Sequence, residues 1–239
     1  HVLSSTVPNL RSYDPAFAYE LAVIVQAGIK SMYQEGENVF YYLTLYNQNY
    51  PMPAMPEDVE EGIIKGMYCY QRSELTGHKV HLLGSGSLMQ EVMQAAKILE
   101  SYACSTDVWS VTSYNELLRQ AHQVERQNRL TPENTQKNYI EQLMLDEGGV
   151  VVACSDFMKS LPSSVSNWFP QSFTALGTDG FGLSEARPEL RDYFEVDARY
   201  IAWSALVSLY ECGQLDDDTL KTARVQLQVP TMKPDPTTF

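Results

Sequence analysis

The sequence contains few of the residues that usually form metal centres and redox sites. Only four histidines and four cysteines occur among its 239 residues. No two cysteines are spaced as Cys-x-x-Cys, and each lies in an apolar or helical stretch. This pattern favours buried structural thiols in a reducing compartment. The cysteines are Cys69, Cys104, Cys154 and Cys212.

Positive charge is also scarce in this chain. Seventeen lysines and arginines stand against thirty aspartates and glutamates, which gives a formal net charge of −13. Such a surface repels phosphate backbones, so we expect no nucleic-acid partner. The same charge is compatible with a basic protein partner or simply with solubility.

Long apolar runs are missing as well. No run approaches the roughly 18 residues that indicate a membrane-spanning helix. The first residues do not show the basic and then apolar segments of a signal peptide. We therefore expect a cytoplasmic protein that contacts no membrane. Because the sequence starts at His1 and not at a methionine, we also expect a fragment or a trimmed product.

The remaining histidines do not form a metal-ligating pattern. His78 and His81 enter a predicted strand three positions apart, which places their side chains on opposite faces. His122 falls in a predicted helix beside charged residues, which is typical of a surface position. The sequence therefore assigns none of these three histidines to a shared metal.

One glycine-rich motif is similar to a phosphate-binding loop but is incomplete. Residues 84–87, Gly-Ser-Gly-Ser, follow a predicted strand and open a predicted helix, where free backbone N–H groups often bind phosphate. Met89 replaces the third glycine of the dinucleotide fingerprint, and no carboxylate follows the second strand near Thr112. A tight strand-to-helix turn is therefore favoured over nicotinamide binding.

What the sequence does contain is a regular alternation of strand-like and helical segments. Its 44% hydrophobic and 20% charged residues are typical of a folded globular protein. Short apolar runs predict strands, and apolar residues at helical spacing predict the helices between them. Alternating β and α units predict an α/β fold with a mostly parallel sheet and helices on both faces. Strands are predicted at 38–45, 80–83, 108–112, 150–153 and 173–176, and helices at 14–34, 87–103, 114–127, 139–146, 155–169, 197–211 and 216–227.

Four of the predicted helices carry a candidate N-terminal cap. Asp14, Asp197 and Asp216 each stand where a helix is expected to begin, and Ser87 with Gln90 fits a capping box. We expect these side chains to accept hydrogen bonds from backbone N–H groups of the first helical turn.

Residues 50–70 indicate a stiff connector between two folded units. Pro51, Pro53 and Pro56 exclude both a helix and a central strand there. The residues before the connector supply one helix and one apolar strand. Such a unit cannot bury both faces of its strand by itself, so we expect a further domain upstream. The predicted division of the chain is 1–50, 51–70 and 71–239.

Six stretches of the chain match a known family in the same order. The connector contains Met-Pro-Ala-Met-Pro-Glu at 52–57, and a later loop reads Gly-Thr-Asp-Gly-Phe-Gly at 177–182. Together the stretches resemble the homodimeric-type pyruvate dehydrogenase decarboxylase component, a thiamine-diphosphate enzyme of the transketolase-like superfamily. The matching stretches are 12–20, 50–70, 82–87, 107–113, 177–182 and 194–198.

This resemblance implies a fold and a parent enzyme. The fold would be a Rossmann-like, three-layer transketolase C-terminal domain, preceded by the last αβ unit of a pyrimidine-binding domain at 1–50. The parent would be a homodimer that decarboxylates pyruvate with thiamine diphosphate and magnesium. It would then acetylate the lipoyl group of dihydrolipoyl acetyltransferase.

The cofactor motif of the family is absent from this chain. Thr178 precedes Asp179-Gly180 where the family's Gly-Asp-Gly motif would need glycine, and no asparagine follows at the right distance. Thiamine diphosphate and magnesium are therefore expected to be bound mainly by residues outside this chain. The chain alone is expected to be inactive, and its role to be mainly structural and dimer-forming.

Two places in the chain are candidate site positions. By resemblance, His1 matches the last histidine of a histidine-rich active-site segment, which makes it the candidate catalytic residue. The loop at 177–182 follows a predicted strand, where open α/β sheets bind ligands. A packing role is favoured for this loop, because no histidine or thiol accompanies it. The expected local charge partners there are Asp179, Glu185, Arg187 and Arg191.

Two other functions stay open on the sequence alone. The chain could be a non-enzymatic interaction or docking module that uses its acidic surface. It could also be the same domain of another transketolase-like enzyme that acts on a different keto acid. The Met-Pro-Ala-Met-Pro-Glu signature favours pyruvate over the second of these.

Overall fold

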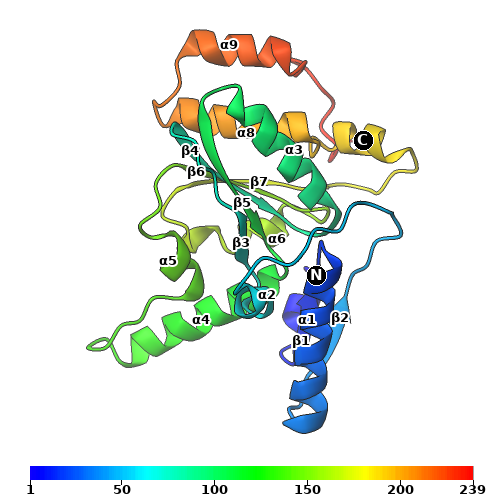
Figure 1. The fold of residues 1–239 in the computed structure, drawn as a ribbon, viewed down its shortest axis with the longest axis vertical. Helices are drawn as coiled ribbons and strands as arrows, with labels where there is room; N and C mark the ends of the chain where they lie inside the picture. The colour runs from blue at the N-terminus through cyan, green and yellow to red at the C-terminus, as the bar shows by residue number, and fades with distance from the viewer. Residues whose placement is uncertain (239) are drawn as a thin grey trace.

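The computed structural model describes residues 1–238 and contains one large and one small sheet (Figure 1). The strands of the large sheet are β3 (Tyr68–Gln71), β4 (His78–Gly84), β5 (Cys104–Ser110), β6 (Val150–Cys154) and β7 (Ser172–Leu176). Their order is β3-β5-β4-β6-β7. β3 runs antiparallel to β5, whereas all other neighbours are parallel. The predicted α/β fold with a mostly parallel sheet is confirmed.

The central strands of the large sheet are buried on both faces. β6 reads Val-Val-Val-Ala-Cys and all of its residues are buried. The same is true of β5. A strand that is covered by helices on both faces needs no alternation of polar and apolar residues. This explains why β6 is continuously apolar, whereas β5 also buries polar side chains, among them Asp107.

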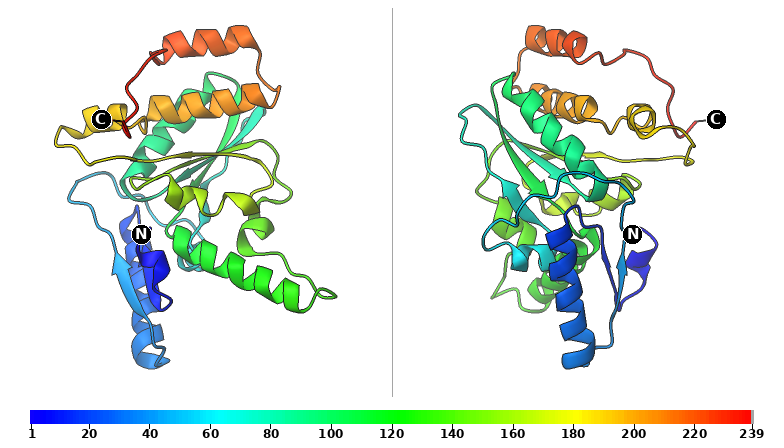
Figure 2. Two further views of the ribbon diagram at one scale, coloured as in Figure 1. Left: turned by 180° about the vertical axis from the view of Figure 1, so that it is seen from behind. Right: turned by 45° about the vertical axis from the view of Figure 1, so that its right-hand side comes forward.

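Helices cover both faces of the large sheet (Figure 2). One face packs against α3 and α8, and α9 lies outside α8. The opposite face packs against α4, α5 and α6. The bounds are α3 (Met89–Glu100), α4 (Tyr114–Leu130), α5 (Tyr139–Met144), α6 (Ser160–Ser163), α7 (Arg187–Tyr193), α8 (Ala198–Glu211) and α9 (Asp217–Gln226), with 3-10 turns η3 (Gly86–Leu88) and η4 (Ser166–Trp168).

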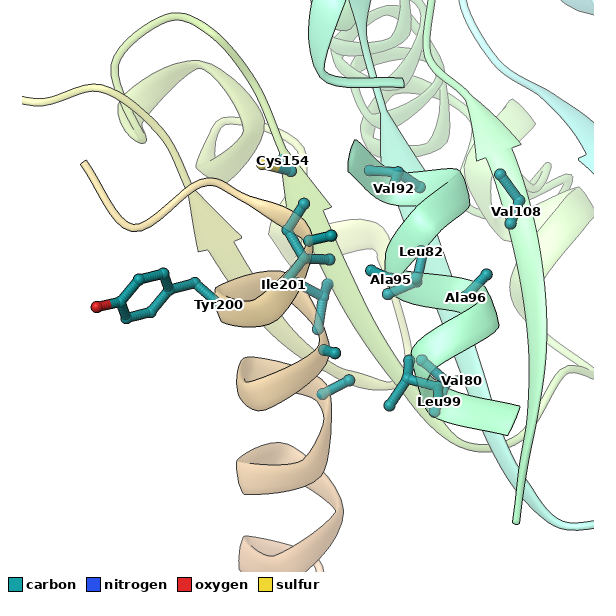
Figure 3. Close-up of a cluster of buried hydrophobic side chains, with 14 of the residues drawn as sticks. Val80, Leu82, Val92, Ala95, Ala96, Leu99, Val108, Cys154, Tyr200 and Ile201 are labelled. Atoms are coloured by element: carbon teal, nitrogen blue, oxygen red, sulfur yellow. The ribbon is translucent and has the colours of Figure 1, made fainter. Parts of the chain in front are cut away.

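The packing of α3 beside α8 depends on small side chains (Figure 3). Ala95 of α3 and Ala202 and Ala205 of α8 are buried, which lets the two helices approach closely. Leu82 of β4 and Val92 of α3 are also fully buried in this cluster. Burying each such large aliphatic side chain stabilises the fold by about 1.5–3 kcal/mol. The main hydrophobic core therefore lies in the large-sheet region.

A smaller αβ unit precedes the large sheet in the chain. Its elements are η1 (Ser4–Thr6), β1 (Leu10–Tyr13), α1 (Ala18–Ile29), the π-helical turn η2 (Lys30–Gln34) and β2 (Phe40–Leu43). β1 pairs with β2 in parallel. Tyr13 and Ile24 form a small core together with Ile63 and Tyr68, which come from the segment after the connector. The αβ unit is thus completed by residues that follow it.

β2 is more exposed than its sequence predicts. Phe40 is 47% exposed and Tyr42 is 45% exposed, whereas Tyr41 and Leu43 pack into the small core. The prediction that this strand is buried on both faces is wrong within residues 1–238, because nothing there covers its outer face. β1 was not predicted, because its four residues are too few to show a period.

The connector is irregular only in its first part. Residues 44–59 contain no helix or strand, as the prolines predict. Then α2 (Glu60–Lys65) follows, and β3 joins the large sheet. Gly66 ends α2 with φ of +107°, and a Cβ at this position would lie 2.4 Å from the carbonyl oxygen of Ser113. Glycine is therefore required where the chain enters the large sheet.

The capping prediction is confirmed at two positions and wrong at two. Asp197 and Asp216 accept hydrogen bonds from first-turn N–H groups of α8 and α9. Asp14 caps nothing, because α1 begins only at Ala18. The Ser87 box does not form either, because a 3-10 turn precedes α3.

The thiols do not all follow the predicted pattern. Cys104 and Cys154 are buried, as expected, and Cys69 is half-buried. Cys212 is exposed, because it lies at the end of α8 at the surface. The prediction of a buried thiol is wrong at this last position.

No helix in residues 1–238 is long and apolar enough to cross a bilayer.

Candidate functional site

The carboxyl ends of β4 and β6 form the switch point of the large sheet. From β4 the chain crosses through α3 to β5, and it later returns through α4 and α5 to β6 on the other side of β4. The two connections therefore lead to opposite sides of β4, and they diverge next to Gly84 and Cys154. Open α/β sheets bind ligands at such a point. The hydroxyls of Ser85 and Ser155 follow at once and lie 3.5 Å apart.

The carboxyl ends of β1 and β2 reach the same place. Asp14 follows β1, and its N–H donates to the carbonyl of Thr112 over 2.8 Å. The carbonyl of Asp14 accepts from the N–H of Gly86 over 3.1 Å. These bonds hold the αβ unit against the loops that follow β4 and β5. We call the polar residues gathered there the junction site: Asp14, Thr44, Tyr46, Ser85, Ser87 and Asp156.

Asp14 is the buried carboxylate of the junction site. It is only 4% exposed. Its Oδ1 accepts hydrogen bonds from the hydroxyls of Thr44 (2.6 Å) and Tyr46 (2.7 Å), whereas Oδ2 has no partner within residues 1–238. Burial raises the pKa of Asp14 to about 6, against the hydroxyls of Thr44, Tyr46 and Ser85, which lower it. The nearby Asp156 raises it further.

His1, the predicted catalytic residue, is connected to Asp14 through Thr44. Its Nε2 lies 3.0 Å from Thr44 Oγ1. The ring packs edge-on against Phe157, with 4.7 Å between ring centroids. It lines a cavity of about 510 Å³ together with Tyr42 and Phe157. The structure thus brings His1 to the edge of the junction site, and its catalytic role stays a prediction.

A second cavity, of about 490 Å³, lies on the other side of Asp156. It lies between the loop at 177–182 and α7, and Ser87 and Arg191 line it as well. Ser87 donates a hydrogen bond to Asp156 Oδ2 over 3.0 Å. The two cavities therefore flank the segment at 156–158.

The loop at 177–182 lies at the carboxyl end of β7, as its sequence predicts. Gly180 has φ of +90°, and a Cβ there would lie 2.3 Å from the carbonyl oxygen of Pro236. Asp179 Oδ1 accepts from the backbone N–H of Lys159 over 2.9 Å. The loop is thus packed on both sides, against α6 and against the C-terminal segment.

The predicted charge pairing around this loop is wrong for two residues. Asp179 lies 3.7 Å from the ammonium of Lys159. Arg191 forms a 2.6 Å ion pair with Glu91 of α3. Both partners are distant in sequence, and proximity along the chain did not reveal them.

The turn at 84–87 packs against the side chains of Asp14 and Tyr46. Gly86 has φ of +49°, and a Cβ there would lie 2.5 Å from Asp14 Oδ2. A phosphate at this helix start would meet a buried carboxylate, and the two negative charges would repel each other. The structure therefore favours the tight turn over a dinucleotide site.

The other histidines and the acidic residues do not form a metal centre. Within residues 1–238, no group of three or more His, Cys, Asp or Glu is placed to bind a metal ion. Both ring nitrogens of His81 have a hydrogen-bond partner. Trp109 Nε1 lies 3.2 Å from Nδ1, and the carbonyl oxygen of Gly148 lies 3.1 Å from Nε2. Burial lowers the pKa of His81. His122 is exposed, as predicted.

Glu20 is a second buried carboxylate that the sequence did not single out. It accepts hydrogen bonds from the N–H groups of Ala16 (2.6 Å) and Phe17 (3.0 Å). It also accepts from the hydroxyls of Tyr68 (2.7 Å) and Ser110 (2.6 Å). One side chain therefore links α1 to β3 and β5. Burial raises the pKa of Glu20, and the four donors oppose that shift.

Two family models match this chain. Residues 66–197 match the "Transketolase-like TK C-terminal domain". Residues 1–53 match the "Pyruvate dehydrogenase E1 component middle domain". Residues 54–65, in the connector and α2, lie between the two matches, and the αβ unit and the large sheet fall in different models.

Curated relatives extend over nearly the whole chain. The pyruvate dehydrogenase E1 component of Escherichia coli (strain K12) is 45% identical over 99% of the chain. That of Pseudomonas aeruginosa is 42% identical over 99%, and that of Mycolicibacterium smegmatis is 39% identical over 95%. The chain spans only 25–27% of the length of these relatives.

Solved structures of transketolases share the fold. A Pichia stipitis transketolase in complex with sedoheptulose 7-phosphate has a TM-score of 0.60 at 21% identity, covering 87% of this chain and 26% of its own. A split-gene transketolase, described as an inactive β4 tetramer, has a TM-score of 0.56 at 17% identity, covering 87% of this chain and 60% of its own. At these identities the likeness shows the fold alone. The first family model covers more than half of the chain, so the chain belongs to the family of transketolase-like C-terminal domains, and its curated relatives are pyruvate dehydrogenase E1 components.

Proposed function

We propose that this chain acts as the C-terminal part of a pyruvate dehydrogenase E1 component. The whole enzyme would decarboxylate pyruvate with thiamine diphosphate and acetylate the lipoyl group of dihydrolipoyl acetyltransferase. The observation that carries the proposal is the 45% identity with the Escherichia coli E1 component over 99% of the chain. In this proposal, residues 1–50 are the last part of the pyrimidine-binding domain, residues 51–70 are the connector, and residues 71–239 form the C-terminal domain.

The chain's own residues build one wall of the proposed site. Asp14 and Thr44 stand where the strands of the αβ unit end, and Ser85 and Asp156 stand where the strands of the large sheet end. Glu20 fixes the two parts to each other. The contribution of this chain is therefore to hold the residues of the junction site in place, and His1 is the residue we assign to the reaction itself.

The cofactors would be held elsewhere. Residues 1–238 contain no cluster that fits magnesium, and the helix start at Gly86 is filled by the carboxylate of Asp14. These residues do not fit the diphosphate and its metal ion. We therefore assign thiamine diphosphate and magnesium to the part of an E1 polypeptide outside this chain.

The αβ unit offers surface for further protein. Val25 is 41% exposed, and Phe40 and Tyr42 are exposed to a similar degree. Large apolar side chains gathered on one unit are typical of an interface. They support a homodimeric E1 enzyme in which more polypeptide covers this unit. We place that enzyme in the cytoplasm on the likeness to bacterial E1 components.

The test is an activity comparison with an E1-length polypeptide that ends in this chain. With thiamine diphosphate and magnesium, we expect it to release carbon dioxide from pyruvate, and the 239-residue chain alone to release none. Faster turnover of 2-oxoglutarate, or ketol transfer from xylulose 5-phosphate, would overturn pyruvate as the substrate. Carbon dioxide release by the chain alone would overturn the assignment of the cofactors to the rest of the enzyme.

A further inference from the structure

We propose that Thr44 and Asp14 are positioning residues for His1, because they hold its imidazole as the Nε2–H tautomer and leave Nδ1 as the basic nitrogen. The proposal deepens the proposed function, and its catalytic consequence rests on it. The tautomer itself is a property of this chain and can be measured without the rest of an enzyme.

The first step is the direction of the bond between Thr44 and Asp14. A carboxylate only accepts hydrogen bonds, and a threonine hydroxyl has one proton to donate. Thr44 Oγ1 lies 2.6 Å from Asp14 Oδ1 and 3.3 Å from the carbonyl oxygen of Tyr13. The shorter, charge-assisted bond is the stronger one. The proton of Thr44 is therefore directed to Asp14.

The second step follows for the imidazole. With its proton directed to Asp14, Thr44 Oγ1 offers only lone pairs to His1 Nε2 at 3.0 Å. Nε2 must then carry a proton, and in a neutral ring Nδ1 has none. No hydrogen bond to Nδ1 occurs within residues 1–238. Nδ1 is the nitrogen that stays available to a ligand.

The third step is that the carboxylate is itself immobile. The hydroxyl of Tyr46 donates to the same oxygen of Asp14 over 2.7 Å. The backbone of Asp14 is bonded to both Thr112 and Gly86. A continuous set of hydrogen bonds therefore leads from the backbone of the large sheet to the ring of His1. Contacts with Phe157 and Tyr42 fix the plane of that ring.

The decisive measurement is the tautomer of His1 in the ¹⁵N-labelled chain. Long-range ¹H–¹⁵N spectra, recorded where the imidazoles are neutral, distinguish a protonated ring nitrogen from an unprotonated one, and His1→Gln assigns the signals. We expect the Nε2–H form to dominate in the wild type and in Thr44→Ser. In Thr44→Val, which keeps the shape but not the hydroxyl, we expect a mixture of both tautomers.

Three results decide the outcome. A wild-type chain with its proton on Nδ1 overturns the proposal, whatever the variants do. So does a Thr44→Val chain that folds normally and keeps the wild-type tautomer. Tyr46→Phe is the matched control, because it removes the other hydroxyl from Asp14 without touching His1, and we expect it to keep the Nε2–H form.

The catalytic consequence is tested in the E1-length polypeptide. We expect Thr44→Val to lower kcat for pyruvate by roughly tenfold or more, as for a general base that is no longer oriented, with little change in KM, and Thr44→Ser to restore kcat. An inactive wild type would overturn the proposed function and leave the tautomer result standing. An active wild type with equal kcat in the valine and serine variants would overturn the positioning role.

Discussion

The large sheet and the αβ unit each contain an apolar strand, β6 and β2, but only the large sheet covers its strand on both faces. Every residue of β6 is buried, whereas β2 leaves Phe40 and Tyr42 nearly half exposed. The αβ unit gains its core from residues such as Ile63 and Tyr68, which lie beyond the connector. The apolar sequence of a strand therefore does not tell which segment covers it, or whether residues 1–238 cover it at all.

The largest expected effect is a cavity in the large-sheet core. Leu82 is fully buried between β5 and β6 under α3. We expect Leu82→Ala to lower the free energy of unfolding by about 2–5 kcal/mol, because a cavity remains. Val25 of the αβ unit is 41% exposed, and Val25→Ala should change it by less than about 0.5 kcal/mol. Urea unfolding of both variants checks the contrast, and equal losses would contradict it.

The next effect concerns the link between the two regions. Removing the Glu20 carboxylate leaves the N–H groups of Ala16 and Phe17 and the hydroxyl of Ser110 without this acceptor. The hydroxyl of Tyr68 can still donate to that of Tyr19. Each unsatisfied buried group costs about 1–3 kcal/mol before relaxation. We expect Glu20→Ala to destabilise the chain by about 3 kcal/mol and to release the αβ unit from the sheet. Limited proteolysis should then cut faster within residues 44–59.

The matched control for Glu20 is the conservative amide. Glu20→Gln keeps the size of the side chain and part of its accepting capacity, so we expect an intermediate loss. If Glu20→Ala unfolds at the wild-type urea concentration, the hydrogen bonds of Glu20 do not hold the two regions together.

Asp14 makes the free energy of unfolding of this chain depend on pH. Burial raises the pKa of Asp14 from 3.8 to about 6, so the folded state binds this proton more tightly than the unfolded state. Its stabilising contribution is complete below about pH 4 and is lost as pH rises through about 6. Two pKa units correspond to about 3 kcal/mol.

The Asp14→Asn variant isolates this contribution. Between pH 4 and pH 7, we expect the free energy of unfolding of the wild type to fall by about 2 kcal/mol relative to that of the variant. Glu20 also has a raised pKa, but it is present in both proteins and cancels. Parallel stability curves across this range would show that Asp14 keeps an ordinary pKa.

Much of the large sheet follows from sequence periodicity, because its strands and helices are long and covered within the same chain. β4, β6 and β7 lie where apolar runs predicted them. The strand predicted at 108–112 overlaps only the end of β5, which begins at Cys104, because the first residues of β5 include Ser105, Thr106 and Asp107. β1, α2 and β3 were missed, because their four to six residues mix polar and apolar side chains in no clear period. The five-residue β6 was found because it is continuously apolar.

The junction site was harder to predict than the fold. Asp14 before Pro15 has the local signature of a helix cap, and that local reading was wrong. Its true partners, Thr44 and Tyr46, lie 30 and 32 residues away in the sequence. Only the parallel pairing of β1 and β2 brings them to one place, and β1 was not recognised. A carboxylate that directly follows a short strand was the signal available.

The smallest expected effects lie in the loop at 177–182, which closes the edge of the large sheet. Gly180→Val must hold φ near +90° and place its Cβ against the carbonyl of Pro236. We expect a loss of about 1–3 kcal/mol from this strain. Asp179→Ala removes one hydrogen bond to the N–H of Lys159, which is worth about 1 kcal/mol. Thermal unfolding of the chain ranks the two variants, and turnover of the E1-length polypeptide shows whether the loop does more than pack. A stable Asp179→Ala enzyme with a tenfold lower kcat would mean that this carboxylate contacts substrate or the lipoyl group. Its effect on turnover would then be larger than its effect on stability.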